Sequence, residues 1–109
     1  MNMLNPKARS DAGQQKSVEI LAKPCLEPST LFESSWRDYV FAEVWSRPGL
    51  DLRARYLISV SGAASADTPN GILDGYLRGA MTGGHFSLPE LREVSLHLAV
   101  YAGWSRAAI

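Results

Sequence analysis

The chain has 109 residues, with eleven basic and eleven acidic side chains, and 46% of its residues are hydrophobic. A chain of this length forms one domain with a modest core, and its balanced charge argues against nucleic-acid binding, which normally needs a basic patch. No apolar run approaches the length of a membrane span. From the balanced charge and the lack of such a run, we expect neither a nucleic-acid nor a membrane partner. The single cysteine, Cys25, excludes an intrachain disulfide and fits a cytoplasmic location.

The start of the chain is polar and lacks the apolar core of a secretion signal. We therefore expect residues 1–13 to form a flexible tail and residues 14–109 to form the folded domain. Apolar residues favour a short helix over Gln14–Ala22.

A longer helix is predicted from Leu31 to about Trp45, because its apolar residues follow helical spacing. Either Ser29 or Thr30 is expected to cap it. The run Arg47-Pro48-Gly49 is typical of a turn.

Two more helices are predicted in the middle of the chain. Asp51 is a good cap for a helix over Leu52–Ser65, whose small residues allow another helix to approach closely. Asp67 or Thr68 is expected to cap the next helix, with Pro69 in its first turn. That helix runs to about Thr82, where Gly83-Gly84 ends it because glycine enters the left-handed conformation without a steric penalty.

The last predicted helix, Ser87–Ala102, carries two stripes of side chains. Ser87 and Glu90 form a capping-box pattern at its start, and Gly103 stops it. One stripe is apolar and the other is polar; their members are Leu91, Val94, Leu98 and Ala102, and Glu93, His97 and Tyr101. No useful strand pattern occurs, so we predict an all-α fold with about five helices.

Two blocks of this sequence resemble the carboxymuconolactone decarboxylase family, which includes the AhpD-like alkylhydroperoxidases. The first block is Val44–Arg55, similar to the family's Trp-x-Arg-Pro-Gly-Leu segment. The second holds Gly79-Ala80, the turn Gly84–Ser87, the run Glu90–Val94 and the run Ala99–Gly103. The blocks and the segment between them span about the last two thirds of the chain.

The resemblance implies an AhpD-like bundle of about five to six helices that assembles as a homo-trimer or homo-hexamer. Family members usually carry a further helix after the position of Trp104, which this sequence does not supply. We therefore expect some apolar surface to be exposed or covered by another subunit.

The positions that carry chemistry in the family differ here. The family histidine falls on Tyr76, and the glutamate falls on Tyr56 within Arg55-Tyr56-Leu57. The two cysteines of the hydroperoxidases fall near Ile72 and Pro69, so no thiol peroxidase activity is expected. The decarboxylases use proton transfer without a cofactor, but tyrosine, with its pKa near 10, is a poor base at neutral pH. The two tyrosines either donate hydrogen bonds to a ligand or fill a pocket that has lost its activity.

His97 is the best remaining candidate for an acid or base, because imidazole as a side-chain type exchanges protons near neutrality and Glu93 and Tyr101 flank it. The structural alternative is a histidine satisfied by Glu93 on the flank of a helix. Arg47 and Arg55 would bind a substrate carboxylate, or else serve a structural role in pairing or in tying loop carbonyls. His85 is expected to be exposed, and no second ligand at metal spacing accompanies it.

The resemblance and these candidate residues lead to two alternative functions. The first is a cofactor-independent lyase or isomerase that acts on a small carboxylated or carbonyl compound, with catalytic residues His97, Tyr76 and Tyr56 and substrate-binding residues Arg47, Arg55, Glu93 and Tyr101. The second is a non-catalytic helical oligomer that binds a small molecule or serves as a scaffold. The first function requires the polar rings on neighbouring helices to converge, within or between subunits, on a hollow large enough for a small ligand; the second does not.

Overall fold

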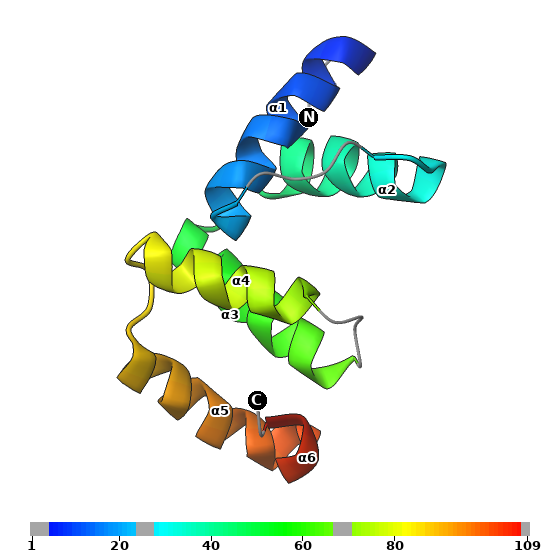
Figure 1. Ribbon diagram of the computed structural model, residues 1–109. Helices are drawn as coiled ribbons and strands as arrows, with labels where there is room; N and C mark the ends of the chain where they lie inside the picture. The colour runs from blue at the N-terminus through cyan, green and yellow to red at the C-terminus, as the bar shows by residue number, and fades with distance from the viewer. Residues whose placement is uncertain (1–4, 24–27, 67–70, 108–109) are drawn as a thin grey trace. The chain divides into compact units, whose positions relative to one another are not determined.

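The computed structural model describes residues 5–23, 28–66 and 71–107. The regular secondary structure of these residues is entirely helical, without a strand among them, which confirms the predicted all-α class and fits an AhpD-like helical bundle (Figure 1). The chain divides into two compact units, Met1–Asp51 and Leu52–Ile109. The assignment of residues 14–109 to one domain stays a prediction.

The N-terminal unit begins with helix α1, Pro6–Leu21. The side chain of Asn5 accepts a hydrogen bond from the N–H of Ala8 at 2.8 Å and caps the helix, and Pro6 occupies its first turn. The predicted tail is therefore wrong from Pro6 to Gly13, which is helical. The expected short helix begins eight residues earlier than predicted.

The second helical segment consists of α2, Leu31–Ser35, and the π-helix η1, Trp36–Val44. Thr30 caps it through its hydroxyl oxygen, which accepts from the N–H of Glu33 at 3.1 Å. The segment has the predicted extent, but its second part is π-helical. The N–H of Trp45 accordingly donates to the carbonyl of Val40 at 2.9 Å, five residues back.

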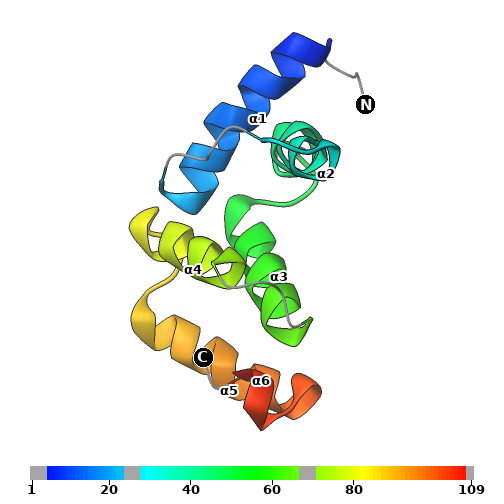
Figure 2. The ribbon, with the colours of Figure 1, turned by 45° about the vertical axis from the view of Figure 1, so that its right-hand side comes forward.

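Part of the α1–η1 interface is apolar. Ile20 and Phe41 are 0% and 1% exposed, and the rings of Trp36 and Phe41 lie 5.1 Å apart. The ring of Phe41 also lies 6.4 Å from that of Trp45. Figures 1 and 2 both show α1 beside η1. This cluster supplies the hydrophobic part of the packing.

The other contacts between α1 and η1 are polar, and the two helix backbones approach each other closely. The Nε of Arg9 lies 3.3 Å from a carboxylate oxygen of Glu43, whose side chain is only 3% exposed. Arg37 donates to the hydroxyl of Ser10 at 3.0 Å. A Cβ on Gly13 would lie 2.1 Å from the carbonyl oxygen of Arg37, so the two backbones meet where only glycine fits.

The C-terminal unit begins with helices α3, Leu52–Ser65, and α4, Ile72–Thr82, which pack side by side. Small residues are buried on both: Ala63 and Ala64 on α3, Gly79 and Ala80 on α4. The close approach of another helix to α3 stays a prediction, and its buried alanines are consistent with it. The expected caps of α4, Asp67 and Thr68, lie outside the described residues, and its observed N-cap is Gly71.

A tight turn joins α4 to helix α5, Leu88–Ala102. Gly84, with φ of +73°, occupies the predicted left-handed position. The N–H of His85 donates a hydrogen bond to the carbonyl of Ala80 at 2.9 Å. Arg53 of α3 holds the turn in place. Its Nε donates to the carbonyl of His85 at 3.0 Å, and its guanidinium lies 4.3 Å from the centre of the Phe86 ring.

The predicted capping box of α5 is confirmed. Ser87 accepts from the N–H of Glu90 at 3.3 Å, and the Glu90 carboxylate accepts from the N–H of Ser87 at 2.9 Å. This backbone bond lowers the pKa of Glu90, and the guanidinium of Arg53, which pairs with the same carboxylate, adds to the shift.

Gly103 ends α5 as predicted, and a short helix α6, Trp104–Ala107, follows, which the sequence did not predict. The hydroxyl of Ser95 donates to the carbonyl of Ala107 at 2.5 Å, so α6 folds back on α5.

Candidate functional site

A groove of about 600 Å³ lies between α3 and α5. Residues spaced four apart on each helix line it, because four residues bring a side chain back to nearly the same helical face. The lining residues are Leu57 and Ser61 of α3, and Glu93, Val94, His97, Leu98 and Tyr101 of α5.

The predicted polar stripe of α5 forms one wall of this groove. The rings of His97 and Tyr101 lie 5.3 Å apart and 22° from parallel, so they stack along the helix. Glu93 lies one turn before His97. All three side chains are exposed, and a solute can reach them directly. The structure thus brings together three of the candidate site residues.

The other wall and the floor are largely apolar. Leu57 contributes from α3, and Val94 and Leu98 contribute from the apolar stripe predicted on α5. Ser61 is the one polar residue that α3 adds to the lining. A site of this kind binds a ligand by apolar contact and orients it with few polar groups.

Tyr56 and Tyr76 do not line this groove. They are 1% and 7% exposed, and the ring of Tyr56 lies 5.0 Å from that of His85. The alternative in which these tyrosines fill the interior therefore has the better support. His85, expected to be exposed, is half-buried against Tyr56, and that expectation is wrong.

The two arginines proposed as carboxylate anchors are also absent from the groove lining. Arg55 is a half-buried residue of α3, and the backbone N–H of Arg47, in the N-terminal unit, donates to the carbonyl of Val44 at 3.3 Å. Sequence reasoning did not propose Leu57 and Ser61 as site residues. The signal was present, since they lie four apart on one helix, but nothing marked that face as lining a groove.

In the described parts of the chain, no three His, Cys, Asp or Glu side chains gather as a metal site would require. No helix in those parts has both the length and the apolar character needed to cross a bilayer.

The helices and the groove define an all-α protein with an acid–base candidate on the wall of an open, mainly apolar groove. The carboxymuconolactone decarboxylase family model matches residues 31–108, from the start of α2 onward. The chain therefore belongs to the carboxymuconolactone decarboxylase family, as the sequence blocks indicated. Helix α1 lies outside the match. Neither the curated proteins nor the solved structures contain a match to this chain.

Proposed function

We propose that this family member is a cofactor-independent lyase or isomerase that transfers a proton to or from a small carboxylated or carbonyl compound in the α3–α5 groove. The observation that carries the proposal is the placement of His97 on the groove wall, with its ring stacked on Tyr101. Imidazole exchanges protons near neutral pH, and a proton donor positioned beside a carbonyl stabilises the enolate formed in such reactions. A reducing, cytoplasmic location belongs to the same proposal and is supported by the single cysteine.

The test is proton exchange in deuterated water, since a proton-transfer catalyst incorporates deuterium next to the carbonyl of its substrate. We expect the wild type to accelerate this exchange in at least one member of a set of cyclic ketones and unsaturated lactones, measured by NMR. His97→Ala should lower the rate by about 10²–10⁴-fold, the usual contribution of a general acid or base. Arg92→Ala, at an exposed position of α5 outside the groove lining, serves as the control and should keep the rate. Equal exchange rates for His97→Ala and the wild type would show that His97 takes no part in the proton transfer.

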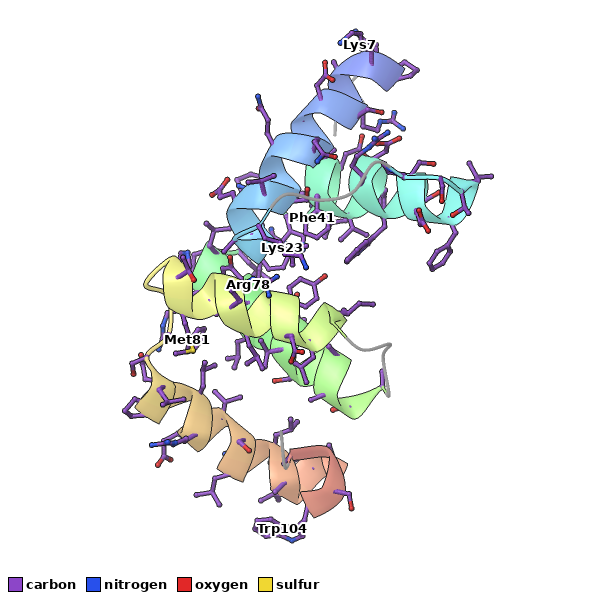
Figure 3. All side chains as sticks on the ribbon, in the orientation of Figure 1. Lys7, Lys23, Phe41, Arg78, Met81 and Trp104 are labelled. Carbon is purple, nitrogen blue, oxygen red and sulfur yellow. The ribbon has the colours of Figure 1, made fainter. Side chains whose placement is uncertain are left out.

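A second candidate function is a non-catalytic helical oligomer that binds a small molecule or acts as a scaffold. Exposed apolar side chains on the C-terminal unit favour it: Leu96, Val100 and Trp104, spaced four apart, are 56%, 74% and 71% exposed. Figure 3 shows Trp104 pointing outward from the end of this unit. Binding of ring compounds in the groove without any proton exchange would support this function over the first.

Both functions are proposed for a homo-trimer or homo-hexamer. These exposed apolar side chains favour association, because contact with another copy removes them from water. We expect light scattering at micromolar concentration to give the mass of three or six chains, and Val100→Lys to reduce it. A stable monomer of the wild type would contradict this assembly.

A further inference from the structure

The charge of the groove lining is negative. Glu93 is the one residue among the lining side chains that carries a formal charge at neutral pH when histidine is neutral. No arginine or lysine belongs to the lining, and Arg55, which the sequence suggested as a carboxylate anchor in the same unit, is not part of it. A ligand in this groove therefore meets the Glu93 carboxylate with no arginine or lysine in the lining to offset it.

This arrangement penalises an anionic ligand. Two like charges a few ångströms apart repel each other, and the repulsion grows as apolar walls displace water from the space between them. Leu57, Val94 and Leu98 form such walls here. Because Glu93 is itself exposed, screening by solvent keeps the penalty moderate, at about a tenfold loss of affinity.

We infer that the groove takes uncharged, ring-shaped carbonyl compounds and discriminates against carboxylates, and that Glu93 determines this specificity. The apolar walls contact the ring of the ligand, and His97 and Tyr101 present flat faces and polar atoms at its edge. The inference rests on the proposed function and narrows its substrate class from carboxylated or carbonyl compounds to uncharged carbonyl compounds.

The experiment compares two probes that differ by one carboxylate, acetophenone and 4-acetylbenzoate. Each is titrated into the labelled full-length chain while NMR follows the ring resonances of His97 and Tyr101. We expect acetophenone to shift both resonances and to bind about tenfold more tightly than 4-acetylbenzoate. In Glu93→Gln the two affinities should become equal, because the repelling charge is gone while the side chain keeps its size.

Asp74→Asn is the matched control. Asp74 is an exposed acid on α4 outside the groove lining, so its neutralisation changes the net charge equally and should leave the tenfold difference intact. Circular dichroism establishes that both variants fold.

The outcomes separate this inference from the proposed function. Equal binding of both probes by the wild type, or a difference that persists in Glu93→Gln, overturns the role of Glu93 and leaves proton transfer by His97 standing. Absence of any shift at His97 and Tyr101 with either probe overturns the inference by removing the groove as a ligand site. The proposed function is tested separately: it is rejected if His97→Ala does not slow the deuterium exchange.

Discussion

Replacement of Gly13 by alanine is expected to lower the free energy of unfolding of the full chain by about 3 kcal/mol or more. The added Cβ would lie 2.1 Å from the carbonyl oxygen of Arg37 and 2.9 Å from its carbonyl carbon. Both are backbone atoms of η1, so relief requires the two helices to move apart. Urea denaturation followed by circular dichroism measures the loss.

Gly62→Ala is the matched control for this substitution. Gly62 also lies within a helix, α3, but a Cβ there would meet nothing within 4 Å. Alanine should raise stability at this position by up to about 1 kcal/mol, because it is the better helix former. Unfolding of Gly13→Ala at the same urea concentration as the wild type would show that α1 and η1 do not meet as described.

Arg9→Ala is expected to destabilise the chain by about 3–5 kcal/mol. The change leaves the Glu43 carboxylate, with a side chain only 3% exposed, without the guanidinium that lies 3.3 Å away. A buried charge without a counter-charge is far more costly than a buried neutral amide. The double variant Arg9→Ala/Glu43→Gln should therefore recover part of the loss in the same urea measurement.

Lys7→Ala provides the comparison for Arg9→Ala. Lys7 pairs with Asp11 on the same helix, but the two side chains are 86% and 63% exposed. Exposed pairs are screened by water and contribute little, so no measurable change is expected. Comparable effects of Arg9→Ala and Lys7→Ala would mean that the Arg9–Glu43 pair is not buried in solution.

Local signals allowed the later helices to be predicted from the sequence. The ends of α5 follow from residues that act within one turn, namely the Ser87–Glu90 capping box and Gly103. The bounds of α3 also agree with the prediction. The first turns of α1 were missed because they carry no apolar pattern: Arg9 and Gly13 show their role only beside η1, which is distant in the sequence.

The candidate site was likewise predictable only where residues of one helix define it. Helical spacing alone placed Glu93, His97 and Tyr101 in one stripe, and the structure shows that stripe on a groove. Spacing did not reveal which face of α3 lies opposite, and it gave no signal that Tyr56 is enclosed, because burial depends on packing between helices. The sequence therefore left two alternatives open for Tyr56 and Tyr76, a ligand pocket or a filled interior, and their burial supports the second.

The π-helix η1 gives the chain a tolerance for changes in length. Its hydrogen bonds reach five residues back, as from Trp45 to Val40, so each turn holds more residues than an α-helical turn. Deletion of one residue within Trp36–Val44 can return this stretch to ordinary α-helix, with the helix unbroken. Homologues one amino acid shorter between Thr30 and Trp45 are accordingly expected, whereas a deletion inside α3 would rotate its remaining side chains away from their partners.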